Sequence, residues 1–196
     1  DSLRNLNYNN YEIIVIDNGS TDGSQKEIRE RFSDVKLIEN KENLGFAEGN
    51  NIGIRRALED EKIEYLFLLN NDTTIEPDIL EELVKVAKSD SKLGMLQPKM
   101  LRMDNPDIID STGHVFKFGK IIDRGSGKID RGQYDSKLDI IGCCAGACLY
   151  KREMFEDIGL FAKSFFLGYE DAELSWRAYK KGWKAKHVPP AIVYHK

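Results

Sequence analysis

A short run of apolar residues ends abruptly on polar side chains near the middle of the chain. The run is Tyr65–Leu69, and Asn70, Asn71 and Asp72 follow it directly. An uninterrupted apolar run of this length predicts a strand buried on both faces, as in the parallel sheet of an α/β domain. Ligands bind outside the carboxyl ends of such strands, where Asp72 could hold a divalent cation against a phosphate. The alternative is that these polar residues only turn the chain toward the next helix.

Strand-like and helix-like segments alternate on both sides of this run. The other predicted strands are Glu12–Ile16, Val35–Ile38, a strand near Met95–Gln97, Ala147–Tyr150, Lys184–Val188 and Ala191–Tyr194. The predicted helices are Gln25–Phe32, a helix carrying Ile54 and Leu58, a helix opened by Pro77, Arg152–Ile158 and Glu170–Lys181. This order predicts an α/β fold with a mostly parallel, doubly wound sheet flanked by helices, in one domain covering residues 1–196.

Two stretches lack this regularity. Glu42–Gly53 contains several glycines, which allow a backbone to approach a ligand or a neighbouring element closely. The spacing of Ile54 and Leu58 that follows suits a helix. Arg102–Asp139 is rich in glycine and charge and has two short strand-like pieces, Val115–Phe118 and Lys120–Asp123. We expect a hairpin or a mobile loop there, of the kind that often covers a site.

Composition and charge exclude several classes of protein. The net charge of -4 argues against nucleic acid as the main partner, because duplex binders carry a basic surface. No apolar run is long enough to span a bilayer.

Cys143, Cys144 and Cys148 lie in one stretch of small residues, with neither paired spacing nor a nearby histidine. They fit neither a disulfide framework nor a zinc finger, so buried thiols are predicted.

Acidic residues at three places are candidates for chemistry. Asp17 follows a β-branched strand and precedes a glycine-containing turn, where a carboxylate can accept hydrogen bonds from a ligand. An Asx-turn or a helix cap is the alternative for Asp17. Asp72 ends the apolar run. Glu170 and Asp171 begin a helix after an aromatic loop, and as a purely structural pair they would only favour the helix dipole.

The order of these motifs is similar to that of a known enzyme family. The segments that carry the resemblance are Ile14–Ser24, Asn43–Gly53, Leu68–Asp72 and Tyr169–Arg177. Together they resemble the inverting glycosyltransferases of family 2, and the rhamnosyltransferase-like branch most closely. The resemblance covers nearly the whole chain. It implies a Rossmann-like fold of the glycosyltransferase A type, with a nucleotide-sugar-binding half at residues 1–100 and an acceptor-binding half at residues 101–196.

The resemblance assigns residues to the donor and to a metal ion. The residues that it implies for the nucleotide-sugar donor are Asp17, Asn18, Ser20, Asn43, Gly45, Asn50, Asn70 and Asn71. For Gly45, close packing is an equally good interpretation. Asn70-Asn71-Asp72 matches the family's Asp-x-Asp metal motif but departs from it at Asn70, so Asp72 would carry most of the coordination of Mg²⁺ or Mn²⁺. His195 matches a histidine that adds a nitrogen ligand; a surface role is the alternative.

The resemblance also implies a reaction and its setting. Asp171 would deprotonate an acceptor hydroxyl that attacks the sugar with inversion, and Glu170 would orient the acceptor. The implied acceptor is a glycan or a lipid-linked sugar in cell-surface polysaccharide synthesis. The implied location is the cytoplasm, with peripheral association at the inner face of the membrane. A further expectation is that the first strand of the fold, which relatives carry before the position of Asp1, is missing.

Two other functions fit the same sequence. One is a catalytically silent domain that binds a nucleotide or sugar within a larger assembly. The other is a nucleotidyltransferase, which also uses a Rossmann-like half. Having both Asp72 and the Glu170-Asp171 pair favours the enzyme over the silent domain, because a binding domain has no need of a second acid.

Overall fold

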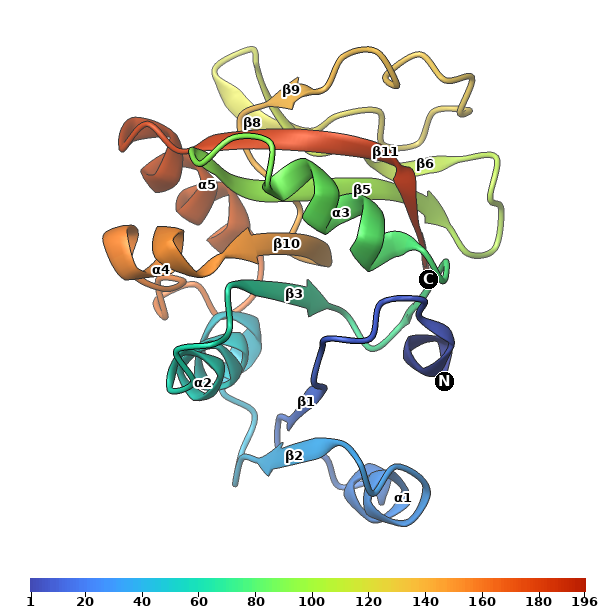
Figure 1. Ribbon diagram of the computed structural model, residues 1–196, viewed down its shortest axis with the longest axis vertical. Coiled ribbons are helices and arrows are strands. Elements are labelled where there is room, and N and C mark those ends of the chain that lie inside the picture. The colour runs from blue at the N-terminus through green and yellow to red at the C-terminus, as the bar shows by residue number, and fades with distance from the viewer.

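The computed structural model describes residues 1–196 as an α/β fold (Figure 1). Its helices are η1 (Ser2–Asn5, a 3-10 helix), α1 (Ser24–Arg31), α2 (Gly45–Leu58), α3 (Ile79–Ala87), α4 (Arg152–Ile158) and α5 (Glu170–Lys180). Its strands are β1 (Ile14–Asp17), β2 (Lys36–Glu39), β3 (Tyr65–Leu69), β4 (Thr73–Ile75), β5 (Leu93–Arg102), β6 (Ile109–Ser111), β7 (His114–Lys117), β8 (Lys120–Asp123), β9 (Asp139–Ile140), β10 (Ala147–Lys151) and β11 (Lys184–His195). No helix has the length and apolar composition needed to cross a membrane.

The central sheet has seven strands, in the order β3-β10-β5-β11-β4, with β6 beside β5 and β9 beside β11. β10 is antiparallel to both β3 and β5, whereas β11 is parallel to β5, so β3, β5 and β11 run in one direction. β1 and β2 form a separate parallel pair. The predicted α/β class is confirmed, and within this sheet β10, β4, β9 and β6 run opposite to β3, β5 and β11.

Helices cover both faces of the sheet (Figure 1). On one face, apolar residues of α2, α4 and α5 share a core cluster with Leu66 and Leu68 of β3. On the other face α3 supplies the helical part of a second cluster, because its Ile79, Leu80 and Leu83 lie on one stripe. The remaining side chains of β3 are only half buried against this second cluster, since β3 lies at an edge of the sheet.

Helix α2 begins at Gly45, nine residues earlier than Ile54, so the glycines are themselves part of the helix predicted from Ile54 and Leu58. The glycines are spaced by four and lie on one face of the helix, which lets that face approach β1 closely. A Cβ atom at Gly49 would lie 3.2 Å from the Asn18 Nδ2 atom, and one at Gly53 would lie 3.1 Å from the Ile16 side chain. Close packing therefore outweighs the low helix propensity of glycine.

The last strand also differs from the prediction. Two strands on either side of Pro189-Pro190 were expected, but β11 is continuous from Lys184 to His195. Its pairing with β5 shifts register between Val188 and Ile192, so a bulge accommodates the two prolines. β5 likewise extends well beyond the predicted Met95–Gln97 and reaches Arg102. As a result, the carboxyl ends of β5 and β11 lie side by side, with His195 paired to Arg102.

The irregular segment from Arg102 to Asp139 contains the predicted hairpin, β7 paired with β8. It also contains β6, which the sequence did not reveal. Arg124, which belongs to this segment, is buried and donates hydrogen bonds to Thr112 and to the Lys137 carbonyl. The cysteines are free; Cys143 and Cys148 are buried as predicted, whereas Cys144 is only partly buried. Burial raises the pKa of the Cys143 thiol.

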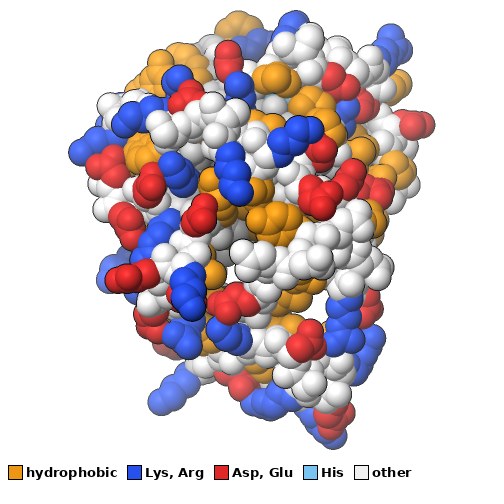
Figure 2. Space-filling model, in the orientation of Figure 1, with side chains coloured by type: hydrophobic (Ala, Val, Ile, Leu, Met, Phe, Trp, Pro, Cys, Tyr) orange, Lys and Arg blue, Asp and Glu red, His pale blue; other side chains and the backbone are white.

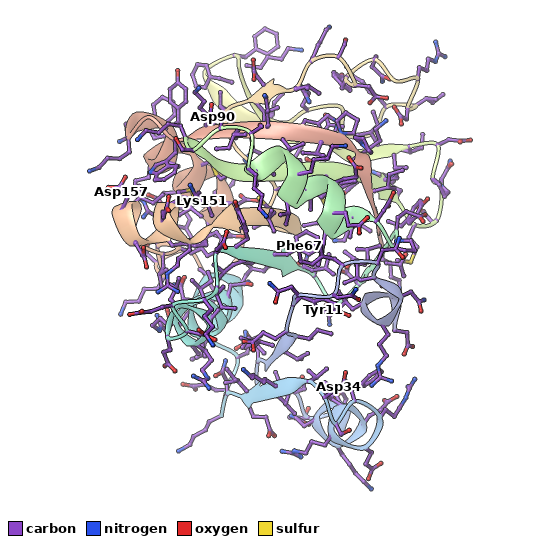
Figure 3. The ribbon with its side chains drawn as sticks, viewed as in Figure 1. Tyr11, Asp34, Phe67, Asp90, Lys151 and Asp157 are labelled. Atoms are coloured by element: carbon purple, nitrogen blue, oxygen red, sulfur yellow. The ribbon has the colours of Figure 1, made fainter.

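The β1–β2 pair and α1 lie apart from the central sheet, and the space-filling view is hollowed between them and the rest of the molecule (Figure 2). Tyr11, just before β1, and Phe67 of β3 mark the two sides of this space (Figure 3). β1 pairs only with β2, and β3 pairs only with β10. Acidic and basic side chains are interspersed over the face in view, without the single-sign surface of a nucleic-acid binder.

Candidate functional site

Asp72 and His195 meet at the carboxyl ends of β3 and β11. The turn after β3 returns as β4, which pairs with β11 and sets His195 opposite Thr73. His195 Nε2 lies 3.4 Å from Asp72 Oδ1 and 3.5 Å from Asn70 Nδ2. The structure therefore brings together three residues that the sequence predicted for the metal and donor. Asn71, the fourth residue of this set, is exposed.

A residue that sequence reasoning missed orients His195. Asp110 of β6 places its Oδ2 atom 2.9 Å from His195 Nδ1. A carboxylate can only accept this hydrogen bond, so Nδ1 is the nitrogen that donates, and Nε2 is the nitrogen that faces Asp72. Pairing of a ligand histidine with a carboxylate in this way is common in metal sites. No signal in the sequence marked Asp110, because it lies in the irregular segment and its partner is 85 residues away.

These residues fit a divalent ion that also takes ligands from a substrate. Asp72 supplies carboxylate oxygen and His195 a neutral imidazole nitrogen. No third histidine, cysteine or acidic side chain joins them to complete a site made of protein alone. The Asp72 side chain is 45% exposed, which leaves its oxygens open to a ligand from solvent. The set therefore suits an ion held between the protein and phosphate oxygens.

The second acidic centre is at the start of α5. Asp171 Oδ2 accepts a hydrogen bond from the Ala145 backbone N–H at 3.1 Å, and Oδ1 accepts one from Ala172 N–H at 2.7 Å. Its side chain is 18% exposed. The Nε2 atom of the His114 imidazole lies near Asp171, and Asp123 approaches the same Nε2 atom. Asp171 is thus a fixed and partly accessible carboxylate, as a general base requires.

Glu170 has different surroundings from its neighbour. Its side chain is buried, and its Oε2 atom has no hydrogen-bond partner. Burial raises the pKa of Glu170, and the charge of Asp171 adds to the effect. Consecutive helix residues point about 100° apart, so the two acids of the pair do not share one environment.

The two centres are joined by consecutive residues of β6. Asp110 contacts His195 on the metal side, whereas the Ser111 hydroxyl donates to Asp123 Oδ1 at 2.7 Å on the Asp171 side. Burial raises the pKa of Asp123; His114 opposes this effect, and the charges of Asp171 and Asp110 add to it. All three carboxylates are therefore close enough to interact.

The donor residues predicted near β1 form a connected network. Asp17 is buried, and burial alone would raise its pKa, but hydrogen bonds from Ser20 and Gln25 outweigh burial and lower the pKa. Its Oδ2 atom accepts from the Ser20 backbone N–H at 3.2 Å and from Gln25 Nε2 at 2.9 Å. Asp17 thus holds the turn after β1 through Oδ2, with its backbone bond reaching the third residue on, where an Asx-turn would bond the second.

Asn18 connects β1 to the start of α2. Its amide donates to Asn43 Oδ1 and the Gly45 carbonyl, and its oxygen accepts from Asn40 and from the Leu44 N–H. Both amide hydrogens and both lone pairs are thus occupied by protein.

Gly45 is required for packing. It has a φ of +80°, and a Cβ atom there would lie 2.5 Å from the Phe166 carbonyl oxygen. Asn50 donates to the Phe46 carbonyl of its own helix. The structure therefore gives Asn18, Gly45 and Asn50 structural contacts and leaves Ser20 and Asn43 exposed on the same side.

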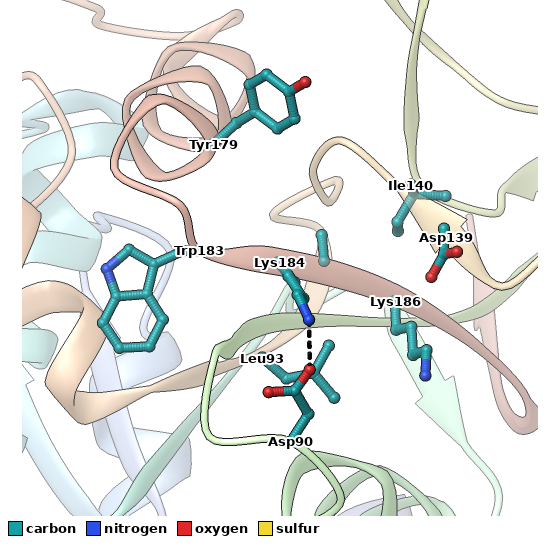
Figure 4. Close-up of a pocket in the computed structure, with 9 residues that line it drawn as sticks. Asp90, Leu93, Asp139, Ile140, Tyr179, Trp183, Lys184 and Lys186 are labelled. Carbon is teal, nitrogen blue, oxygen red and sulfur yellow. Dashed lines mark hydrogen bonds and ion pairs between the residues drawn. The ribbon is translucent and has the colours of Figure 1, made fainter.

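A surface hollow of about 340 Å³ lies elsewhere and contains none of the predicted residues (Figure 4). It is near the amino end of β11, where Lys184 pairs with Asp90 at 2.7 Å. Ligands of α/β sheets bind at the opposite, carboxyl ends of the strands. The carboxyl-end cluster, and not this hollow, is the candidate site.

This chain is similar in sequence to several glycosyltransferases over most of its length. It is 29% identical over 173 residues to the low-salt glycan biosynthesis hexosyltransferase Agl10 of Haloferax volcanii, covering 85% of this chain and 53% of the relative. It is 26% identical over 202 residues to N-acetylglucosaminyl-diphospho-decaprenol L-rhamnosyltransferase of Mycobacterium tuberculosis. This match covers 93% of this chain and 66% of the relative. The chain thus spans about half to two thirds of these relatives.

Solved structures confirm the glycosyltransferase A-type fold. GalNAc-T7 with UDP, GalNAc and Mn²⁺ superposes with a TM-score of 0.76 at 19% identity, over 99% of this chain and 39% of that chain. The mannosyltransferase PcManGT from Pyrobaculum calidifontis, in complex with GDP-Man and Mn²⁺, superposes with a TM-score of 0.69 at 19% identity. This match covers 99% of this chain and 50% of that chain. The family model for glycosyl transferase family 2 matches residues 1–159, and the chain belongs to that family.

Proposed function

We propose that this chain is the catalytic domain of an inverting glycosyltransferase that moves a sugar from a nucleotide-sugar donor to an acceptor hydroxyl. The observation that carries the proposal is the pairing of two centres at the carboxyl ends of the strands. One is the Asp72–His195 pair, open to a phosphate, and the other is the fixed carboxylate of Asp171. A silent binding domain has no need of the second centre.

The donor binds between the β1 end and the Asp72 turn in this proposal. Asp17 keeps Oδ1 available for a base N–H or a ribose hydroxyl, while Oδ2 holds the turn. Asn18 fixes the loop before α2 and so shapes the nucleoside side of the site. The family relatives that act on decaprenol-linked and glycan acceptors support a role in cell-surface glycan synthesis. The decaprenol in the name of one relative supports a lipid-linked acceptor, and we propose that the reaction takes place at the inner face of a membrane.

Asp72 and His195 hold the divalent ion in this proposal, with Asp110 keeping the His195 lone pair directed at it. The ion would neutralise negative charge that develops on the departing diphosphate. A nitrogen ligand favours Mn²⁺ over Mg²⁺, which prefers oxygen. The neighbours crystallised with Mn²⁺ support this choice.

The Asp171 carboxylate removes the proton from the acceptor hydroxyl. The Ala145 N–H fixes Oδ2, so the carboxylate presents one orientation to the acceptor. As the new bond to the sugar forms, the acceptor oxygen loses its proton to Asp171 and the nucleoside diphosphate leaves from the opposite face. Glu170 begins the same helix and keeps the orienting role proposed for it.

Nucleotide binding tests the metal-dependent part of the proposal. Calorimetry of UDP, GDP and dTDP, each with Mn²⁺ or with EDTA, should identify one nucleotide whose binding requires the metal. Asp72→Ala should reduce the affinity with Mn²⁺ to the level found with EDTA. Asp104→Ala is a matched control, because Asp104 is an exposed carboxylate just beyond the same end of β5. Equal affinity with Mn²⁺ and with EDTA for every nucleotide would contradict the metal role.

A further inference from the structure

The imidazole of His114 lies between two carboxylates at the base of the β7–β8 hairpin. Its Nε2 atom is 3.5 Å from Asp123 Oδ1 and 3.8 Å from Asp171 Oδ2. The His114 side chain is only 4% exposed, so water competes little for these contacts. Catalytic hydrogen bonds are commonly long before substrate binds and shorten in the complex.

Backbone pairing holds the ring in this place. His114 N–H donates to the Gly142 carbonyl at 2.8 Å, and the His114 carbonyl accepts from Ile141 N–H at 3.0 Å. Gly142 in turn lies against α5, since a Cβ atom there would be 2.1 Å from Ser175 Cβ. The hairpin, the Gly142 segment and α5 therefore form one packed unit, and the distance from His114 to Asp171 is set by that packing.

The surroundings of the ring also decide which nitrogen carries the proton. Nδ1 is buried and has no hydrogen-bond partner. A proton on Nδ1 would be a buried N–H without an acceptor, whereas a proton on Nε2 faces two carboxylates. His114 is therefore the Nε2–H tautomer. The other two histidines differ, because Nδ1 of His195 faces Asp110 and Nδ1 of His187 faces the Gln97 carbonyl.

We propose that His114, supported by Asp123, is a positioning residue for the Asp171 base. The inference rests on the proposed function of Asp171. The Nε2–H group donates to Asp171 Oδ2 when the site closes, and together with the Ala145 N–H it limits the carboxylate to one rotamer. Asp123 is itself held by the Ser111 hydroxyl and lies near the same Nε2 atom, so it keeps the Nε2 edge of the ring turned toward the two acids. Neither residue touches the sugar or the nucleotide in this scheme.

Two variants of His114 separate positioning from simple support of the fold. In His114→Gln the side-chain amide can still present an N–H toward the carboxylates, whereas His114→Leu fills similar space without a donor. Nucleoside diphosphate release is measured with the nucleotide sugar whose nucleotide binds in the screen of UDP, GDP and dTDP. His114→Leu should lower kcat by about 10- to 100-fold, the range found when a supporting residue is removed. The donor KM should change by less than about threefold, and His114→Gln should recover most of kcat.

A double-mutant cycle tests whether His114 acts through Asp171. His114→Leu should cost little further activity in an Asp171→Asn protein, because the group that it positions is already inactive. Equal losses in both backgrounds would overturn the proposal, and so would equal losses in the Leu and Gln variants. Thermal unfolding of each variant shows whether a loss of activity follows a loss of folded protein.

Nitrogen-15 NMR of the three histidines gives a result that needs no turnover. The spectrum should show one Nε2–H and two Nδ1–H imidazoles, with the Nε2–H signal missing in His114→Gln. An Nδ1–H tautomer at His114 would overturn the proposal. If the wild-type protein binds and turns over no nucleotide sugar, the proposed function fails, and the tautomer still decides whether His114 faces the two acids as a donor.

Discussion

Asp110 lies 85 residues before His195 in the chain, yet its carboxylate contacts the His195 imidazole at 2.9 Å. The contact exists because β6 pairs with β5 on one side while β11 pairs with β5 on the other, so both reach the carboxyl end of the same strand. The carboxylate sets the tautomer of His195 and leaves Nε2 free to bind a metal.

Replacing Asp110 should weaken metal-dependent nucleotide binding without touching the metal ligands. Asp110→Ala removes the acceptor for Nδ1–H, so the ring can rotate or change tautomer, and we expect affinity for the nucleotide with Mn²⁺ to fall by about 10- to 100-fold. Affinity in EDTA should not change. Calorimetry with the nucleotide chosen by the screen measures both values. Asp107→Ala, an exposed acid three residues earlier, should leave both unchanged; a similar loss there would point to general disturbance of this segment.

Asp171→Asn should separate chemistry from binding. The amide keeps the shape of the side chain but cannot accept the acceptor proton, so turnover should fall by roughly 10² to 10⁴ while nucleotide affinity stays within a few-fold. Steady-state kinetics with an identified donor measures this. Near-normal turnover would end the assignment of Asp171 as the base.

Glu170→Gln should cost less turnover than Asp171→Asn. Its thermal stability at neutral pH should be equal to or above that of the wild type, because burial disfavours the charged form of Glu170. A larger turnover defect in Glu170→Gln than in Asp171→Asn would reverse the roles of the two acids.

Two glycines with similar backbone angles should respond differently to alanine. Gly23 has a φ of +91°, and a Cβ atom added there would meet nothing within 4 Å, whereas at Gly45 the added carbon would meet the Phe166 carbonyl. Gly23→Ala should therefore cost only the strain of the left-handed backbone, about 1 kcal/mol. Gly45→Ala adds a clash with backbone and should cost roughly 3 kcal/mol or more. Urea unfolding measures both, and equal losses would show that the Phe166 loop moves away freely.

The order of elements and the residues at strand ends could be predicted because both depend on local signals. The apolar run before Asp72 and the acidic start of α5 are readable in single short segments. His114, Asp123 and Asp110 were missed because their roles depend on the pairing of β7 with β8 and of β6 with β5, and all three residues lie in a segment without periodicity. The start of α2 was missed for a related reason. Its glycines look like a loop until the close packing against β1 is known.

The buried His187 should make the stability of the protein depend on pH. Its Nδ1 atom lies 3.1 Å from the Gln97 carbonyl, and its Nε2 atom is buried without a partner. Burial lowers the pKa of His187 to about 4; the Gln97 carbonyl opposes this, and Arg124 and Lys99 add to it. The folded protein therefore holds the ring neutral at pH values where the unfolded chain already binds a proton.

Stability should fall as pH decreases from about 6.5 through about 4, because in this window the unfolded state binds more protons than the folded state at this residue. The expected slope is at most about 1.4 kcal/mol per pH unit, or roughly 3 kcal/mol in total. His187→Asn keeps an N–H for the Gln97 carbonyl but cannot titrate. Urea unfolding between pH 7 and pH 4 should therefore give a shallower loss of stability for this variant than for the wild type, whatever their difference at pH 7. Parallel curves would mean that the His187 ring already binds its proton in the folded protein, and that acid sensitivity comes from other groups.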